Sequence, residues 1–363
     1  MPVALIHDWL NQIGGAEDVL ETLVEMFPAA PVYTSIYWPE KMPPHYRQWP
    51  IRTSFMDRLP LIHRHHQPYL FVYPFAFQSF NLNGYDLILS NKSGFCHGIR
   101  KPANANAIHI CYCLTPTRYG WGFDNYASRE GLSGATRQIL RPALKLLQQW
   151  DKAAAQKVDH FIAISSAVRQ RIARFYERDS VIIYPPVKTE RFQIADSVGD
   201  YFLCLGRLIP YKRVDLAVQA CTQLGLPLLV AGEGRDRDRL ERLAGPTVKF
   251  LGRVPAAAVP DLMARAKAFI FPGLEDFGIA PVQAQAAGRP VIAFAGGGAL
   301  DTVIDGQTGH LFPEQSLNSL ISILESFRPS NFNPTVIRNF ALKFDRQVFE
   351  QQLTEFIKAV ARH

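Results

Sequence analysis

The sequence has 363 residues, of which 39 are basic and 32 acidic, so that the net charge is +7, and 48% of the residues are hydrophobic. A chain of this length and hydrophobic content can bury two sizeable cores. The sequence shows no apolar segment long enough to span a bilayer, no internal repeat and no low-complexity segment, and we expect no signal peptide. These features exclude membrane-spanning and repeat proteins, and the odd number of cysteines, five, adds the expectation of a reduced, cytoplasmic protein.

Alternating strand and helix patterns fill the first half of the chain. Short apolar runs predict strands at Val3–His7, Asp86–Ser90, Ile108–Cys113, His160–Ile164 and Val181–Tyr184. Strands that alternate with helices are typical of α/β domains with a doubly wound parallel sheet. Consecutive prolines fit neither a helix nor a central strand, so Tyr184-Pro185-Pro186 is the best candidate for a linker.

A basic motif, Gly206-Arg207-Leu208-Ile209-Pro210-Tyr211-Lys212-Arg213, follows the first strand predicted after the linker, Tyr201–Leu205. An amphipathic stretch that opens at Lys212 predicts a helix, so the chain turns at the carboxyl end of a strand, where open α/β sheets bind ligands. Arg207 offers a planar fork of donors and Lys212 a compact charge, two complementary ways to hold phosphate oxygens. The same two residues could also be solvated surface charges.

A second motif, Glu275-Asp276-Phe277-Gly278-Ile279-Ala280-Pro281-Val282-Gln283, follows another predicted strand, Ala268–Pro272. Pro281 suits the first position of a helix, which places the loop 277–280 just before a helix N-terminus, a natural anion site. Glu275 can accept hydrogen bonds from sugar hydroxyls, or it can cap a nearby N–H group. Together the two motifs predict a site for a diphosphate that carries a sugar.

The remaining pattern completes the second half. The predicted strand Pro290–Phe294 runs into Gly296-Gly297-Gly298, where missing side chains would let the backbone approach a ligand closely. Asp345 is a predicted N-cap for a final helix. The apolar stripe of this helix consists of Phe349, Leu353, Phe356, Ile357 and Val360.

The order and spacing of these motifs resemble the retaining family 4 glycosyltransferases of the GT-B fold, in particular the mannosyltransferase-like branch that builds bacterial surface polysaccharides. The resemblance covers nearly the whole chain, and its further markers are Gly14-Gly15-Ala16-Glu17, Thr53-Ser54-Phe55, Tyr112-Cys113-Leu114-Thr115-Pro116-Thr117-Arg118-Tyr119, Gly232-Glu233-Gly234, Gly288-Arg289-Pro290-Val291-Ile292-Ala293 and Asp305-Gly306-Gln307-Thr308-Gly309. It implies two Rossmann-like domains that face each other across a cleft, with the donor in the cleft and hinge closure completing the site. Residues 1–186 and the C-terminal helix 342–363 would form the acceptor domain, and residues 187–341 the donor domain.

The resemblance also implies roles for individual residues. Arg207 and Lys212 would bind the donor diphosphate and Glu275 the transferred sugar, and these three are the predicted catalytic residues. Further donor-binding positions would be Gly14, Gly15, Gly206, Arg253, Phe277, Gly278, Ile279, Ala280 and Gln283. Acceptor or cleft positions would be Asp8, Thr115, Arg118 and Tyr119. No metal and no other cofactor is expected.

Two residues depart from the family pattern. Gln283 stands where relatives commonly carry a second Glu for the nucleotide ribose, and the change would cost ~1 to 3 kcal/mol of binding. Leu114 stands where relatives often carry a His before Thr-Pro. By the resemblance, however, retaining transferases of this fold use the leaving phosphate itself to take the acceptor's proton, so an enzyme remains the expectation. The alternatives are a degenerate GT-B module that binds nucleotide sugar without transferring it and, disfavoured because no catalytic acid pair stands out, a nucleotide-sugar epimerase.

We therefore predict a retaining transferase that moves glucose or mannose from UDP-glucose or GDP-mannose to a polyprenyl-diphosphate-linked or growing polysaccharide at the cytoplasmic face of the inner membrane. Residues 1–186 contain 19 basic and 14 acidic residues, a net charge of +5 that suits an anionic membrane or a lipid diphosphate. The best candidate for the contact is the basic and then aromatic segment His63–Phe75, of which half the aromatics could be core. No nucleic-acid motif accompanies it, so no nucleic acid is expected as a partner.

Two further patterns resemble metal sites, but ordinary structural roles suit them better. His63, His65 and His66 lack the spacing of a closed zinc site and fit a polar loop. Asp236-Arg237-Asp238 opens a charged helix, whose N-terminus favours acidic residues.

Overall fold

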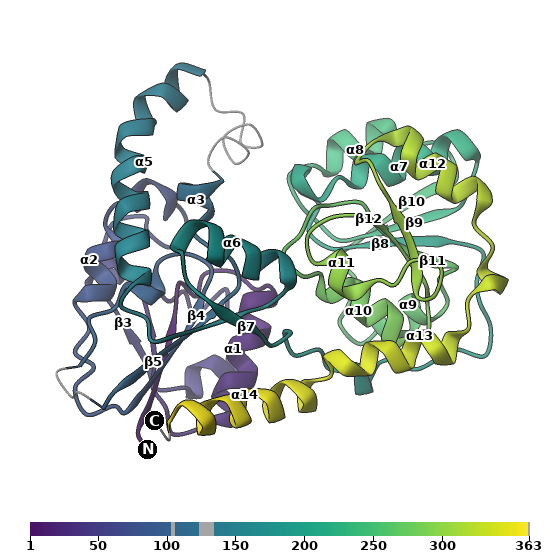
Figure 1. The fold of residues 1–363 in the computed structure, drawn as a ribbon. Helices are drawn as coiled ribbons and strands as arrows, with labels where there is room; N and C mark the ends of the chain where they lie inside the picture. The colour runs from purple at the N-terminus through teal and green to yellow at the C-terminus, as the bar shows by residue number, and fades with distance from the viewer. Residues whose placement is uncertain (103–105, 123–133, 362–363) are drawn as a thin grey trace. The chain divides into compact units, whose positions relative to one another are not determined.

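The computed structural model describes residues 1–102, 106–122 and 134–361, which divide into two compact units (Figure 1). Unit 1 comprises residues 1–184 together with the chain from Glu350 onward, and unit 2 comprises residues 185–349. Each unit contains one parallel sheet with helices on it, as the sequence predicts. The division after Tyr184 falls in the Tyr184-Pro185-Pro186 segment, whereas residues 342–349 belong to unit 2 and not, as expected, to the first domain.

The sheet of unit 1 has seven parallel strands in the order β3-β2-β1-β4-β5-β6-β7. The strands are β1 (Val3–His7), β2 (Val32–Thr34), β3 (Ile51–Thr53), β4 (Leu87–Lys92), β5 (Ile108–Cys113), β6 (His160–Ala163) and β7 (Ser180–Ile182). All five predicted strands are present, and two of them, β1 and β5, have the predicted bounds. The prediction missed β2 and β3, because three residues are too few to show a periodicity.

Helices cover both faces of this sheet (Figure 1). They are α1 (Gly15–Met26), α2 (Tyr73–Gln78), α3 (Arg118–Trp121), α5 (Gly134–Ala155), α6 (Ser166–Tyr176) and α14 (Arg346–Val360), whose part from Glu350 belongs to unit 1. Residues of α2 and α5 join Ala4 and Ile6 of β1 in one core. Side chains alternate along a strand, so His7 points to the opposite face, where it meets Glu17 of α1.

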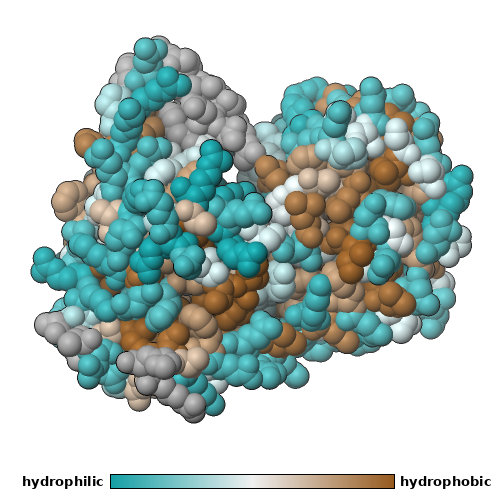
Figure 2. All heavy atoms as spheres, in the orientation of Figure 1, coloured by the Kyte–Doolittle hydropathy of each residue, from teal (hydrophilic) through white to brown (hydrophobic). Residues whose placement is uncertain are grey.

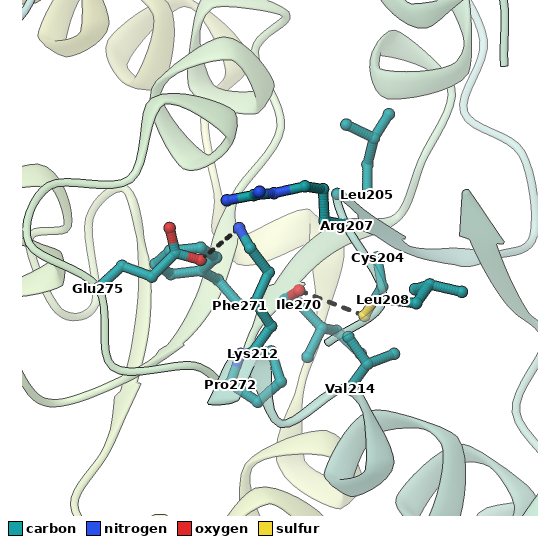
Figure 3. A pocket seen from close by; sticks show the side chains of 11 residues that line it. Cys204, Leu205, Arg207, Leu208, Lys212, Val214, Ile270, Phe271, Pro272 and Glu275 are labelled. Atoms are coloured by element: carbon teal, nitrogen blue, oxygen red, sulfur yellow. Dashed lines mark hydrogen bonds and ion pairs between the residues drawn. The ribbon is translucent and has the colours of Figure 1, made fainter. Parts of the chain in front are cut away.

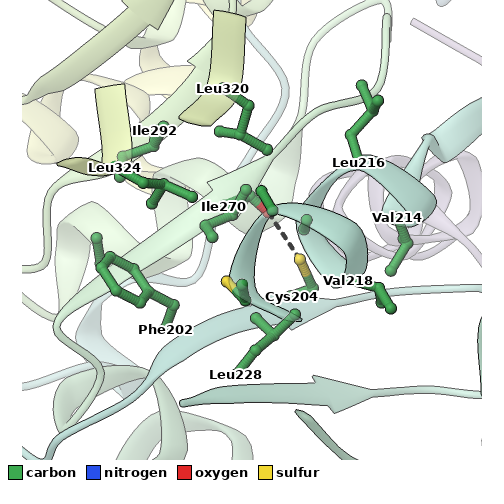
Figure 4. Packing of buried hydrophobic residues seen from close by; sticks show 14 of the residues in the cluster. Phe202, Cys204, Val214, Leu216, Val218, Leu228, Ile270, Ile292, Leu320 and Leu324 are labelled. Atoms are coloured by element: carbon green, nitrogen blue, oxygen red, sulfur yellow. Dashed lines mark hydrogen bonds between the residues drawn. The ribbon is translucent and has the colours of Figure 1, made fainter. Parts of the chain in front are cut away.

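The sheet of unit 2 has six parallel strands in the order β10-β9-β8-β11-β12-β13. They are β8 (Phe202–Leu205), β9 (Leu228–Ala231), β10 (Val248–Gly252), β11 (Ala268–Phe271), β12 (Val291–Phe294) and β13 (Gly309–Phe312). The helices are α7 (Val214–Leu224), α8 (Arg237–Leu243), α9 (Val259–Ala264), α10 (Ile279–Ala286), α11 (Ala299–Thr302), α12 (Leu317–Ser326) and α13 (Pro334–Ala341). The core between the sheet and helices α7 and α12 joins apolar side chains from β8, β9, β11 and β12 (Figure 4).

Two helices of unit 2 begin at other residues than predicted. The chain after β8 forms a short 3-10 turn, Pro210–Lys212, and α7 starts only at Val214, because Arg213 adopts a left-handed conformation with φ +51°. Helix α10 starts at Ile279, so Pro281 is its third residue and not its first. Proline has a fixed φ that fits the first turn of a helix, so Pro210 and Pro281 can stand at more than one position of that turn.

The final helix agrees with the prediction. The Gln347 amide donates a hydrogen bond of 2.8 Å to Asp345 Oδ1, so Asp345 is the N-cap of α14. Phe349, Leu353 and Ile357 are buried along one side of the helix. Among residues 1–102, 106–122 and 134–361, no helix has the length and apolar character needed to cross a membrane.

Candidate functional site

The carboxyl ends of β8 and β11 form a small pocket in unit 2 (Figure 3). Gly206, with φ +151°, turns the chain out of β8 and leads to Arg207, and Lys212 follows at the end of the 3-10 turn. A Cβ atom on Gly273, just after β11, would lie 3.0 Å from the Lys212 Cα, so the two loops are in backbone contact. The close approach of these loops fixes the position of Lys212 beside the end of β11.

Lys212 and Glu275 form an ion pair in this pocket. The Lys212 Nζ and Glu275 Oε1 atoms are 2.6 Å apart, and each side chain is 20% exposed. The Arg207 side chain extends over the pair (Figure 3). The space left between these side chains is only about 20 Å³, roughly the room of one water molecule. The Glu275 carboxylate therefore competes with a diphosphate for the ammonium group.

The glycine run 296–298 supports the loop that carries Glu275. The Gly298 amide donates a hydrogen bond of 2.9 Å to the Glu275 carbonyl oxygen, and a Cβ atom on Gly297 would clash with the same oxygen. The missing side chains therefore admit the Glu275 loop, and an approach of this backbone to a ligand stays a prediction. Leu274 contacts the same glycines.

Exposed apolar side chains border this loop. Leu274, Leu300 and Ile304 are all at least one-third exposed. Figure 2 shows apolar residues gathered on the visible face of unit 2, over the region of α10 and α11. Of these residues, Leu274 directly precedes Glu275 in the chain.

The loop before α10 can contact a ligand through its backbone but not through the Phe277 side chain. The Phe277 ring is buried and packs edge-on against Phe344, with ring centroids 5.6 Å apart. Gly278 has φ +96°, and a Cβ atom there would lie 3.0 Å from the Phe271 ring. Because α10 begins at Ile279, its first N–H groups, those of Ile279 and Ala280 included, lack intrahelical acceptors and can bind an anion.

The pocket brings together only part of the predicted donor site. Gly206, Arg207, Lys212 and Glu275 all line it. Arg253 is exposed beyond the end of the edge strand β10, separated from β8 by β9, and does not line it. Gln283 lies in the second turn of α10 instead of the predicted first turn, since the helix starts earlier than expected. Its contact with a ribose stays a prediction.

In unit 1, Gly14 is the N-cap and Gly15 the first residue of helix α1, and their contact with the donor stays a prediction. The Asp8 side chain, in contrast, is occupied. Its two carboxylate oxygens accept hydrogen bonds of 2.6 to 2.8 Å from the amides of Ser93, Gly94, Phe95 and Cys96. Asp8 is also buried. It therefore organises the loop after β4, and its contact with an acceptor stays a prediction.

The predicted acceptor residues Thr115 and Arg118 lie in the loop after β5. Thr115 is buried and its hydroxyl lies 3.5 Å from the Arg171 guanidinium. Arg118 is exposed and begins α3. The Tyr119 side chain lies outside the described residues. Leu114, which replaces the family's His, is partly exposed in the same loop.

A buried polar network that the sequence analysis missed holds this loop. Thr117 Oγ1 donates to Asp151 Oδ1 at 2.6 Å, while the Trp121 Nε1 and Tyr176 hydroxyl groups each donate to Asp151 Oδ2 at 2.7 Å. Lys92 Nζ donates to Thr117 Oγ1 at 3.1 Å. Burial, the largest single influence, lowers the pKa of Lys92, but the neighbouring acidic groups, Asp151 first among them, together outweigh it and keep the pKa above its ordinary value. The one signal in the sequence was a lysine at the end of an apolar strand.

His63 and His66, which resemble metal ligands in the sequence, contact other side chains of the protein. His63 Nε2 lies 2.9 Å from Asp57 Oδ1, and His66 is buried, with Nδ1 at 2.9 Å from the Tyr73 hydroxyl. Burial lowers the pKa of His66 to about 4. Asp236 forms an ion pair with Arg239 of α8. The described residues contain no group of three or more His, Cys, Asp or Glu side chains that could hold a metal ion.

Two protein-family models together match most of the chain. Residues 13–191 match the family Glycosyltransferase Family 4, and residues 187–329 match Glycosyl transferases group 1. The chain belongs to the group 1 glycosyltransferases. One relative of this glycosyltransferase is an uncharacterized glycosyltransferase of Methanocaldococcus jannaschii, which is 27% identical over 61% of this chain and 67% of the relative. Another is a GDP-mannose-dependent phosphatidylinositol monomannoside mannosyltransferase of Mycolicibacterium smegmatis, which is 33% identical over 33% of this chain and 36% of the relative.

Solved structures share the fold of this glycosyltransferase. HepE from Anabaena in complex with UDP matches with a TM-score of 0.72 and 18% identity over 99% of this chain and all of HepE. Sucrose-phosphate synthase from Thermosynechococcus elongatus matches with a TM-score of 0.72 and 20% identity over 98% of this chain and 99% of the synthase. These likenesses confirm the predicted architecture of two Rossmann-like domains of the GT-B type.

Proposed function

We propose that this glycosyltransferase moves a hexose from a nucleoside diphosphate sugar to a lipid-linked or growing polysaccharide with retention of anomeric configuration. The observation that carries the proposal is the pocket in which Arg207 and Lys212 meet Glu275 beside the N-terminus of α10. Two cations and a helix N-terminus suit a diphosphate, and a carboxylate next to them suits the hydroxyls of the attached sugar.

In the proposed reaction, the bond between the sugar C1 and the diphosphate oxygen breaks and a bond between C1 and the acceptor oxygen forms on the same face. The proton of the acceptor hydroxyl passes to the leaving phosphate oxygen, so no protein base is required. The transition state places growing negative charge on the diphosphate, which Arg207 and Lys212 stabilise. Leu114, which has no proton chemistry, is compatible with this route.

The donor is proposed to be UDP-glucose or GDP-mannose, and the relatives support both. The mycobacterial relative is named as GDP-mannose-dependent, and HepE has been solved in complex with UDP-glucose. A polyprenyl-diphosphate-linked saccharide is the proposed acceptor, in the assembly of a surface polysaccharide. Residues 1–186 would bind this acceptor and residues 187–341 the donor.

We propose that transfer needs no metal ion, because Arg207 and Lys212 provide the positive charge that a divalent cation gives to the diphosphate in other enzymes. Transfer measured after treatment with EDTA should then equal transfer in the untreated sample. A loss of transfer that Mg²⁺ or Mn²⁺ restores would contradict this part of the proposal.

The acceptor implies a place of action. We propose that the protein binds peripherally to the cytoplasmic face of the inner membrane, where polyprenyl-linked saccharides are accessible. The net charge of +5 in residues 1–186 supports contact with anionic lipid.

A catalytically degenerate module that binds nucleotide sugar is the second candidate. It is favoured by Leu114 and by the ion pair that fills the pocket. Calorimetry against a panel of nucleotide sugars, with a parallel hydrolysis assay, separates the two. Binding with slow release of free sugar supports the transferase, binding without any release supports the module, and no binding to any nucleotide sugar contradicts both.

A further inference from the structure

The segment between β3 and the end of α2 is a compact, two-sided part of unit 1. It contains the 3-10 turns Phe55–Arg58 and Gln67–Tyr69 and helix α2. Met56 and Ile62 point into the core together with Tyr73 of α2. The Tyr69 hydroxyl donates a hydrogen bond of 2.9 Å to the Pro60 carbonyl oxygen and so ties the two halves of the segment together.

The same segment also exposes large apolar side chains. The exposed fractions are 46% for Phe55, 71% for Leu61, 40% for Phe71 and 67% for Phe75. Phe71 and Phe75 are four residues apart along a helically hydrogen-bonded stretch, so they share one face. His66 and Tyr73, in contrast, are buried, which means that the apolar surface is made by a different set of side chains from the simple run His63–Phe75.

Leu61 is held in a backbone conformation that disfavours it. Its φ is +56°, in the left-handed region, which glycine and asparagine adopt readily and a leucine does not. Its carbonyl oxygen accepts the amides of Arg64 and His65, which closes the turn. A strained leucine whose side chain is mostly in solvent contributes no packing to its own unit, and such strain is typical of a residue kept for an interaction.

The charges around this surface are positive. Arg58 and Arg64 are exposed, and neither side chain has a hydrogen-bond or ion-pair partner within the described ranges. The only acid between residues 51 and 80 is Asp57, whose Oδ1 is already engaged by His63 and by the Tyr37 amide. The segment therefore offers exposed apolar groups and two exposed cations, and its single carboxylate is engaged.

We propose that Phe55, Leu61, Phe71 and Phe75, with Arg58 and Arg64, form a surface that inserts into the interface of an anionic bilayer, and that Leu61 is its tip. We call it the Leu61 surface. Apolar side chains gain free energy in the acyl boundary while arginines beside them pair with anionic headgroups. A bilayer, unlike a folded partner, makes no demand for directional polar contacts, which matches a surface of apolar and cationic groups. The inference rests on the proposed peripheral membrane function and gives it a defined structure.

The test is co-sedimentation of the full chain with vesicles of phosphatidylcholine, with and without phosphatidylglycerol. Binding should require phosphatidylglycerol and weaken with salt. Leu61→Asn should weaken partitioning by about tenfold without lowering the unfolding temperature, because asparagine accepts the left-handed conformation. Leu251→Asn, at an exposed leucine of β10 in unit 2, is the matched control and should bind like the wild type.

The arginines are tested in the same way. Arg64→Glu should reduce binding about tenfold and flatten its salt dependence, whereas Arg242→Glu, on the exposed side of α8, should not. Equal binding of Leu61→Asn and wild type to the vesicles would overturn the proposal, as would vesicle binding that ignores both salt and Arg64→Glu. Sugar release from a nucleotide sugar in solution should be unchanged in Leu61→Asn. The absence of such release in the wild type would contradict the transferase and leave the vesicle result standing.

Discussion

Replacement of Glu275 by glutamine should separate the binding of the nucleotide from the binding of its sugar. The Glu275 carboxylate lies 2.6 Å from the Lys212 ammonium, the group that is proposed to bind a diphosphate oxygen. Glu275→Gln removes this competition and also the repulsion between the carboxylate and the diphosphate. A nucleoside diphosphate without sugar should therefore bind the variant more tightly than the wild type.

The size of the effect follows from the exposure of the pair. Both side chains are 20% exposed, so solvent screens the attraction, and about 1 kcal/mol is a suitable scale for releasing Lys212. This corresponds to roughly fivefold tighter binding of UDP or GDP. A nucleotide sugar should gain less, because the sugar hydroxyls lose a charged acceptor whose hydrogen bonds contribute about 1.5 to 3 kcal/mol.

Isothermal titration with UDP, GDP and the corresponding nucleotide sugars measures both quantities. Glu314→Gln removes the same charge from an exposed position of unit 2 and should leave all affinities unchanged. If Glu275→Gln binds UDP and GDP no more tightly than the wild type does, Lys212 is not the group that the diphosphate meets. If nucleotide sugars gain as much as the free nucleotides, Glu275 does not contact the sugar.

Three further changes test separate parts of the account. Gln283→Glu should tighten nucleoside diphosphate binding by up to about tenfold, ~1.4 kcal/mol, without altering sugar preference, and weaker binding in titration would place Gln283 away from the ribose. Gly297→Ala should weaken nucleotide-sugar binding by about tenfold, because the added Cβ would displace the Glu275 loop. Gly306→Ala is the control, since Gly306 has a similar positive φ but open space around it, and it should bind like the wild type. Equal affinities of the two variants would show that the glycine run does not position the Glu275 loop. Tyr176→Phe removes a hydrogen bond to a buried carboxylate and should lower the unfolding free energy by about 1 to 3 kcal/mol in urea denaturation, and an unchanged midpoint would show that the network does not stabilise unit 1.

The sequence predicted those strands whose burial is continuous. Val3–His7 and Ile108–Cys113 have the predicted bounds, because a strand buried in a parallel sheet reads as an unbroken apolar run. Val181–Tyr184 is shifted to Ser180–Ile182 at the edge of the sheet, where burial is weaker. Val32–Thr34 was missed although it is fully buried, since three residues carry no pattern of their own.

The convergence of the pocket residues was predictable for a topological reason. Arg207 and Lys212 follow one strand and Glu275 follows its neighbour in the sheet, and the carboxyl ends of adjacent parallel strands meet at one edge. The ion pair was not predictable, because it depends on the path of two loops. The same holds for Asp8, whose four amide partners lie some 85 residues further along the chain.

The central claim is that Arg207 and Lys212 stabilise the leaving diphosphate of a nucleotide sugar. The most direct test is the turnover number for sugar release or transfer in Arg207→Ala and Lys212→Ala, with the fold monitored by circular dichroism. Each variant should lose about 10²- to 10³-fold in turnover while its spectrum and unfolding temperature stay near those of the wild type. Unchanged turnover in both variants with the fold intact would contradict the account.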